Sequence, residues 1–454
     1  MTTPDGQRWA IIGGGILGMT LALRLAQRGL SVSLIERADQ LGGLASAWRL
    51  GDVTWDRHYH VTLLSDRHTR SLLDELGLEH DMRWVPARTG FYTGGRLHSM
   101  SSALEFLLFP PLGPISKARL AATILHASRL TDWRQLEKIP VEDWLRAWSG
   151  NRTFEKIWLP LLRAKLGNAY SKTSAAFIWA TIQRMYAARR AGLKQELFGY
   201  LPGGYARTLD AFRRRLEEAG VHLFLGMTVA AVRKEQTGEI CVELASGTRI
   251  RFDRVVMTVP APIAARLCPG ISDHEQTLLE QVEYQGIVCA SLLLKKPLAD
   301  YYITNVTDAR FPFTAVIEMS ALVDREQFGG NALVYLPRYL ASDDPGFNIP
   351  DHEWGERAVE ALSAMYSGFD PQDVLAFQVS RERHVYALPT LGASERVPQL
   401  RCSLPGMFFV NSSQIVNATL NVNETVRLAE ESVDPLLSAA ADQGADSGPW
   451  QSPR

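Results

Sequence analysis

The stretch from 9 to 36, WAIIGGGILGMTLALRLAQRGLSVSLIE, constrains the fold more than any other part of the chain. Its unbroken apolar run over 9–12 is typical of a parallel strand buried on both faces. A glycine turn over 13–18 follows, then apolar residues at helical spacing up to Gly29, then a second strand over 31–35. This order predicts the start of an α/β domain with a parallel sheet.

The glycine turn carries the spacing G-x-G-x-x-G, and an acidic residue ends the second strand. The first glycine permits a tight turn, the second a close approach of the backbone to a pyrophosphate, and the third close packing of the helix on the strand. The helix start directs free N–H groups toward phosphates, and the carboxylate suits ribose hydroxyls. Three glycines in a loop are often only a turn. Here the flanking strand, helix and acid favour a dinucleotide site at Gly13, Gly15, Ile16, Leu17, Gly18 and Glu36.

The next segment, RADQLGGLAS over 37–46, resembles the second glycine element of a flavoprotein superfamily. That superfamily includes amine oxidases, protoporphyrinogen oxidases, phytoene desaturases and UDP-galactopyranose mutases, and in them the glycine pair lies beside the pyrophosphate of FAD. The resemblance implies FAD as the cofactor and a glutathione-reductase-like, Rossmann-type nucleotide domain. It also implies cofactor contacts from Arg37, Gly42, Gly43, Leu44 and Ala45.

At 454 residues, the chain exceeds what one hydrophobic core normally supports, so we expect two domains. The resemblance implies an FAD-binding domain interleaved with an α+β substrate domain. The FAD-binding domain would comprise 1–100, 201–282 and 385–436, and the substrate domain 101–200 and 283–384. The small and polar residues at 437–454 predict a disordered tail.

Composition excludes several partners. A net charge of -1 gives no reason to expect nucleic acid. The four cysteines are far apart and have no metal-like spacing, so we expect no metal and buried thiols in a reducing cytoplasm. We find neither an apolar leader before the first strand nor the ~18 consecutive apolar residues of a membrane span.

Two segments resemble parts of the superfamily that approach the flavin ring. In WDRHYHV, over 55–61, His60 aligns with a histidine that lies against the flavin, although His58 stands where relatives carry glycine. In RHVYALP, over 383–389, Tyr386 aligns with an aromatic residue beside the isoalloxazine. Histidines that alternate between core and surface, and a core tyrosine, are the alternative interpretations. His60 and Tyr386 are the candidate catalytic residues.

Further cofactor contacts are implied by resemblance in the second half of the chain. Relatives contact the adenine through the residue at Val229 and the nucleotide near Pro260. They also end a late strand in Gly-Asp, where this chain has Asn411-Ser412. The helix that follows completes the set with Asn421 and Asn423, and Asn423 would cap it. Cys289 stands where amine oxidases carry a lysine near the flavin, which lowers the expectation of amine oxidation.

One apolar segment, ALEFLLFPPLGP over 103–114, precedes Lys117 and Arg119. It predicts either a buried helix start in the second domain or a surface that contacts a bilayer, where basic residues meet anionic head groups. Four tryptophans and several basic residues then share a helical stretch over 141–190. A helical core with a solvated face is the simpler interpretation, and a substrate clamp is the alternative.

Together these features predict an FAD-dependent oxidoreductase that transfers a hydride between flavin N5 and an apolar substrate of isoprenoid or porphyrinogen type. A mutase like the UDP-galactopyranose enzymes is an alternative, with a diphosphate held by Arg163, Arg184 or Arg189. An escort protein that has lost flavin is another. The sequence leaves the electron acceptor and the oligomeric state open.

Overall fold

The structure, a computed structural model, describes residues 6–101, 103–189 and 197–442. Its first sheet has five parallel strands in the order β10-β2-β1-β14-β20. The two strands expected near the N-terminus are adjacent in it, which confirms that prediction. The strands are β1 Arg8–Ile12, β2 Ser31–Ile35, β10 His222–Phe224, β14 Arg254–Met257 and β20 Met407–Phe409.

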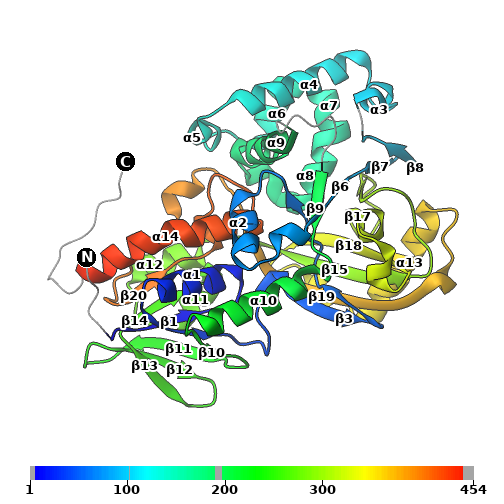
Figure 1. The fold of residues 1–454 in the computed structure, drawn as a ribbon. Coiled ribbons are helices and arrows are strands. Elements are labelled where there is room, and N and C mark those ends of the chain that lie inside the picture. The colour runs from blue at the N-terminus through cyan, green and yellow to red at the C-terminus, as the bar shows by residue number, and fades with distance from the viewer. Residues whose placement is uncertain (1–5, 102, 190–196, 443–454) are drawn as a thin grey trace.

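Both faces of this sheet are covered (Figure 1), which explains the unbroken apolar run of β1. Trp9 and Ile11 pack with helices α1, α10 and α14 on one face. Ala10 and Ile12 pack with a small antiparallel sheet and α11 on the other. The elements are α1 Ile16–Gln27, α10 Gly204–Glu218, α14 Val422–Asp442, α11 Ala261–Leu267, α12 Asp273–Glu280, β11 Val229–Lys234, β12 Ile240–Leu244 and β13 Arg249–Phe252.

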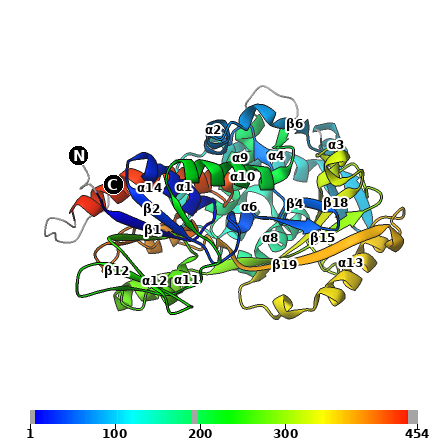
Figure 2. The same ribbon diagram turned by 60° about the horizontal axis from the view of Figure 1, so that its bottom comes forward.

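A second, seven-stranded sheet has the order β19-β15-β18-β17-β16-β7-β8 and is antiparallel except between β16 and β7. Its strand β15 is buried at every position. Helix α13 packs on one face, and Figure 2 shows it beside β19 and β15 at the opposite end of the molecule from the first sheet. The elements are β7 Thr89–Thr93, β8 Arg96–Ser99, β15 Tyr284–Leu294, β16 Ile303–Val306, β17 Ala315–Glu318, β18 Ala332–Ala341, β19 Val374–Ala387 and α13 Asp351–Met365.

A cluster of helices from the middle of the chain forms a third part of the molecule, at the top of Figure 1. Trp144, Trp158 and Trp179 are buried in its core, as expected for a helical core, whereas Trp148 is exposed. A π-helical turn at Phe154–Trp158 precedes α8. The helices are α3 Ala103–Leu108, α4 Pro114–Arg129, α5 Trp133–Leu136, α6 Val141–Ser149, α7 Asn151–Thr153, α8 Leu159–Leu166 and α9 Ala175–Arg189.

Small elements connect these parts. Strands β3 and β4 form a hairpin, and β5, β9 and β6 form a three-stranded sheet beside helix α2. Their bounds are β3 Ala47–Leu50, β4 Val53–Asp56, β5 Thr62–Leu63, α2 Arg67–Glu75, β6 Arg83–Pro86 and β9 Leu197–Tyr200.

Strands β7 and β8 form a hairpin, and this hairpin belongs to the second sheet because β7 pairs with β16. The chain therefore enters that sheet about ten residues before the boundary we placed at 100. Strand β19 similarly carries 385–387 into the second sheet. The division into two domains otherwise stays a prediction.

The C-terminal helix is longer than expected. We placed the start of a disordered tail at 437, but α14 continues to Asp442 because Ala439 and Ala440 are buried with α1 in the first core. The rest of the expected tail, 443–454, lies outside the described residues. In the part of the chain that the structure describes, no helix has the length and apolar character needed to cross a membrane.

Candidate active site

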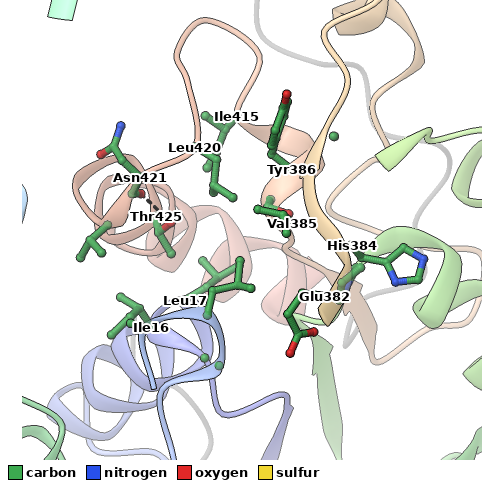
Figure 3. A pocket seen from close by; sticks show the side chains of 18 of the residues that line it. Ile16, Leu17, Glu382, His384, Val385, Tyr386, Ile415, Leu420, Asn421 and Thr425 are labelled. Atoms are coloured by element: carbon green, nitrogen blue, oxygen red, sulfur yellow. Dashed lines mark hydrogen bonds between the residues drawn. The ribbon is translucent and has the colours of Figure 1, made fainter. Parts of the chain in front are cut away.

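A cavity of about 1190 Å³ lies between the first sheet, the second sheet and the helical cluster. Its wall combines segments that are far apart in the sequence (Figure 3). The start of α1, the end of β19 and the segment just before α14 surround the same space. They contribute Ile16 and Leu17, Val385 and Tyr386, and Leu420. Helices α8 and α9 complete the wall on the side of the helical cluster.

The two glycine elements lie side by side at one end of this cavity. The N–H of Gly42 donates to the carbonyl of Gly14 at 2.8 Å, and Gly15 and Gly42 form a parallel bridge. A Cβ at Gly15 would meet no atom of the described residues within 4 Å, whereas a Cβ at Gly18 would lie 1.9 Å from the carbonyl oxygen of Gly13. Gly15 thus borders open space and Gly18 permits close helix packing. These are the roles that a dinucleotide turn requires.

Glu36 lies at the same end of the cavity, at the close of β2. Its carboxylate accepts hydrogen bonds from the backbone N–H groups of Gly14 at 2.6 Å and Ala38 at 2.8 Å. Its backbone carbonyl accepts from Met227, which brings the segment before β11 and Val229 to this end. The contacts of Glu36 with ribose and of Val229 with adenine stay predictions, but the structure places both residues at one site.

Most of the predicted cofactor residues line the cavity, and three do not. Gly18 lies behind the turn. Asn411 is fully buried, and its Oδ1 accepts from the N–H of Ser413 at 3.0 Å. Asn423 accepts from the N–H of His68 at 2.9 Å, which ties α14 to α2. The residues that line the cavity are Gly13, Gly15, Ile16, Leu17, Glu36, Arg37, Gly42, Gly43, Leu44, Ala45, Val229, Pro260, Ser412 and Asn421.

The cap of α14 also differs from our expectation. Asn421, rather than Asn423, accepts a hydrogen bond from the N–H of Glu424, at 3.1 Å. The helix begins at Val422, so Asn421 is the residue that precedes its first turn. The two asparagines at the start of this helix therefore differ. Asn423 has a structural role, whereas Asn421 faces the cavity.

His60 lines the cavity and is held in one tautomer. Its Nδ1 lies 2.8 Å from the carbonyl oxygen of His58, so Nδ1 carries the proton and Nε2 is an acceptor. Burial lowers the pKa of His60 to about 4, and the ring is therefore neutral near pH 7. The ring centre lies 4.9 Å from that of Tyr205. A neutral, oriented imidazole can accept a hydrogen bond, but its catalytic role stays a prediction.

His58 and Asp56 support this segment from behind. Nδ1 of His58 lies 3.3 Å from the carbonyl of Leu44, and Nε2 lies 2.9 Å from the hydroxyl of Ser380 on β19. The histidine that replaces the family's glycine thus links the second glycine element to the second sheet. Asp56 accepts from the N–H of Tyr205 at 2.7 Å, and burial raises its pKa to about 7.

Tyr386 lies both in the core of the helical cluster and in the cavity wall. Its hydroxyl donates to the backbone carbonyl of Lys165 at 2.6 Å, which ties the end of β19 to α8. Burial raises the pKa of Tyr386, so the phenol stays neutral. Tyr386 is thus both a core residue and part of the cavity wall. Its participation in chemistry stays a prediction.

Several polar residues that face the cavity have partners that the sequence did not predict. Lys165 and Tyr339 meet on its wall, with Nζ 2.7 Å from the phenol oxygen. Arg57 forms an ion pair with Glu382 of β19, and burial lowers the pKa of this arginine. Each of these pairs joins residues at least 170 positions apart, so no local pattern could have revealed them.

Cys289 is buried in β15 and does not line the cavity. The position that we aligned with the family's lysine is therefore a core position in this chain, and burial raises the pKa of its thiol. Within 6–101, 103–189 and 197–442, no group of three or more acidic, histidine or cysteine side chains is arranged to hold a metal ion.

These features define the protein first as a dinucleotide-binding protein whose cavity extends from a glycine turn to a wall of apolar helices. The sequence model of the family described as flavin containing amine oxidoreductase matches residues 18–420, and the chain belongs to that family. The chain is accordingly an FAD-dependent oxidoreductase, and the prediction of FAD is confirmed at the level of the family.

Known relatives extend the comparison over the whole chain. The chain is 26% identical to coproporphyrinogen III oxidase of Mycobacterium tuberculosis over 462 residues, covering 96% of this chain and 99% of that protein. It is 25% identical to zeta-carotene desaturase of Synechocystis over 294 residues, which cover 59% of this chain and 58% of that protein. A crystal structure of an Exiguobacterium protein assigned as a protoporphyrinogen oxidase superposes with a TM-score of 0.75 at 18% identity, over 95% of this chain and 99% of that one. This likeness confirms the predicted fold class.

Proposed function

We propose that this oxidoreductase acts on an apolar substrate of porphyrinogen or isoprenoid type, held against helices α4, α8 and α9. The observation that supports this most directly is the composition of that wall, which is mainly aliphatic and aromatic. Its apolar members are Ile124, Trp158, Leu161, Leu162, Phe177, Ile178, Ile182 and Met185. Such a surface excludes water and favours an apolar ligand.

FAD, when bound, supplies hydride transfer at N5, and the chain supplies binding and orientation. The glycine cradle and Glu36 would hold the nucleotide. His60 offers a neutral acceptor, and Tyr386 is held in place by its hydrogen bond to Lys165. In this arrangement the apolar wall fixes which carbon of the substrate faces the reacting position.

The names of relatives agree with this substrate class. The activities that the names coproporphyrinogen III oxidase and zeta-carotene desaturase describe belong to those proteins, and they support the proposal for this chain by analogy. Both describe oxidation of large molecules with many carbon atoms, for which a cavity of about 1190 Å³ has room.

The mutase alternative has weaker support, because it needs arginines free to bind a diphosphate. Arg163 is exposed and does not line the cavity, and Arg184 forms an ion pair with Asp66 at 2.9 Å. The side chain of Arg189 lies outside the described residues. The escort alternative conflicts with membership in a family of flavin-containing oxidoreductases.

The first experiment is to identify the cofactor and then the substrate. The visible spectrum of the purified protein and chromatography of the flavin released on denaturation should show FAD. Anaerobic mixing with coproporphyrinogen III, protoporphyrinogen IX, phytoene or zeta-carotene should then bleach the flavin band with one of them. Bleaching by a primary amine and by none of these compounds would contradict the proposal.

We also propose that the corner between α3 and α4 contacts a bilayer surface. Leu107, Leu108 and Ile115 are 62%, 69% and 78% exposed there, whereas Phe109 and Leu112 of the same segment are buried. We had offered a buried helix start and a bilayer-contacting surface as alternatives for this segment. Different residues of the one segment now fit each of them. Helix α4 also lines the cavity through Ile124, which would bring the cavity near the membrane that stores apolar substrates.

Liposome co-sedimentation tests this contact. We expect the protein to sediment with anionic vesicles. The triple change of Leu107, Leu108 and Ile115 to serine should reduce the bound fraction several-fold. The reason is that ~1 kcal/mol or more of binding free energy is lost with each aliphatic side chain that the bilayer would bury. Equal sedimentation of both proteins would show that this corner is not the contact.

A further inference from the structure

The wall formed by the helical cluster contains a cation that the proposed function does not yet use. Lys165, in α8, lines the cavity, and among the described residues no carboxylate pairs with it. Its Nζ donates to the hydroxyl of Tyr339 at 2.7 Å and lies 4.0 Å from the centre of that ring and 5.3 Å from the centre of the Tyr386 ring. The hydroxyl of Tyr339 in turn lies 2.9 Å from that of Tyr59.

Each carboxylate that the described residues contribute to the cavity wall already has a partner other than Lys165. Glu36 accepts from two backbone N–H groups, Asp66 pairs with Arg184, and Glu382 pairs with Arg57. Among the described residues, the helical wall therefore carries one positive charge that has no counter-ion from the protein, at Lys165. An ammonium group in an apolar wall is costly unless a ligand supplies hydrogen-bond acceptors and charge.

The position of Lys165 is set by the surrounding structure. Its backbone carbonyl accepts from the hydroxyl of Tyr386, and the two tyrosine rings confine its side chain to the cavity. Of the three N–H donors of the ammonium group, one serves Tyr339, which leaves donors for a ligand. A held cation beside an apolar wall suits a ligand with an apolar body and an anionic end.

We propose that Lys165 binds a carboxylate of the substrate, so that the substrate is an amphipathic carboxylic acid and not a neutral hydrocarbon. This inference rests on the proposed function for its identification of the cavity as the substrate site. It also separates the two substrate types named above, because a carotenoid-type hydrocarbon has no anionic group. A single ammonium matches one carboxylate, whereas a diphosphate needs several cations, and Arg184 is already paired with Asp66.

Binding of simple amphiphiles to the holoenzyme tests this. Decanoate, decanol and decyl phosphate would be titrated at fixed ionic strength below their aggregation concentrations, with calorimetry as the readout. We expect decanoate to bind roughly tenfold more tightly than decanol, since a hydrogen bond to a charged group is worth about 1.5–3 kcal/mol. We expect Lys165→Met to remove this preference and Lys165→Arg to retain most of it.

Lys156→Met is the matched control, because Lys156 is exposed in the adjacent turn and does not line the cavity. It should preserve the preference for decanoate. Equal binding of decanoate and decanol, or a preference that survives Lys165→Met, would overturn the inference. Tighter, Lys165-dependent binding of decyl phosphate than of decanoate would overturn the assignment to a carboxylate.

The flavin content of the same preparations separates this inference from the proposed function. FAD that is present without any preference for decanoate contradicts the role of Lys165 alone. Protein without FAD that still prefers decanoate through Lys165 contradicts the proposed function and supports the anion site.

Discussion

The two ends of the cavity are built in different ways. The nucleotide end is formed mainly by backbone and glycine from the first forty-five residues, with Gly15 bordering open space. The substrate end is formed by side chains from α4, α8, α9, β18 and β19, which are spread over more than 250 residues. Backbone geometry fixes the first end, and side-chain chemistry fixes the second.

This difference suggests how each end can change. A cradle made of backbone tolerates few substitutions, because a Cβ would occupy the ligand's space or clash with the protein. A wall made of side chains can change its ligand through single substitutions while the fold stays the same. We therefore expect damage at the nucleotide end to remove the cofactor, and damage at the substrate end to leave it in place.

The largest effect is expected at Gly15. Its backbone has φ −73° and ψ 173°, which alanine adopts without strain, and within the described part of the chain no atom lies within 4 Å of the new Cβ. Gly15→Ala should therefore fold normally and bind FAD roughly 100-fold more weakly, because overpacking costs up to about 3 kcal/mol. FAD titration of the apoprotein and its thermal midpoint measure the two effects.

Gly113→Ala is the matched control for this change. Gly113 also precedes a helix, with φ −76° and ψ 168°, and a Cβ there also meets no protein atom within 4 Å. It should keep full FAD affinity. Retention of normal affinity by Gly15→Ala would break the assignment of the nucleotide end.

The next effect concerns Asp56, at the junction of the two ends. It accepts from the first turn of α10, and its backbone carbonyl accepts from Tyr335 of the second sheet. Burial raises its pKa to about 7 from an ordinary value of 3.8. The stability that this protonated group contributes is thus present below pH ~4 and is lost as the pH rises through about 7.

Asp56→Asn keeps the acceptor for Tyr205 and removes the titration. Relative to this variant, the wild type should lose about 2–3 kcal/mol of unfolding free energy between pH 5 and pH 8, at 1.36 kcal/mol per pH unit. Urea unfolding at the two pH values measures the difference, and titrating groups far from Asp56 cancel in the comparison. The exposed Asp52→Asn is the control. Parallel pH dependence of Asp56→Asn and the wild type would contradict the raised pKa.

The smallest effect is expected at Phe177, in the substrate wall. Phe177→Ala should leave the FAD content unchanged and raise the KM for the apolar substrate roughly tenfold, because part of a phenylalanine contact of about 1.5–3 kcal/mol is lost. Phe369→Ala changes a partly buried phenylalanine away from the cavity and is the control. Loss of FAD from Phe177→Ala alone would show that the two ends of the cavity are not independent.

The sequence determined the nucleotide end almost completely. Three features define that end: the glycine spacing, the apolar run of β1 and the acid after β2. All of them lie within one βαβ unit, so the sequence of that unit is enough to predict its structure. Which sheet the hairpin of β7 and β8 joins depends on a distant partner, β16, and no local pattern predicts that pairing.

Only the tertiary structure decided the substrate end. Lys165 meets Tyr339, Arg57 meets Glu382, and His58 meets Ser380 across separations of 170 residues or more, and no periodicity in the chain marks such pairs. Their meeting depends on how the second sheet and the helical cluster pack together. The sequence by itself thus determined that the chain binds a dinucleotide. The packing of distant segments decided which side chains line the substrate end of the cavity, beside the dinucleotide site.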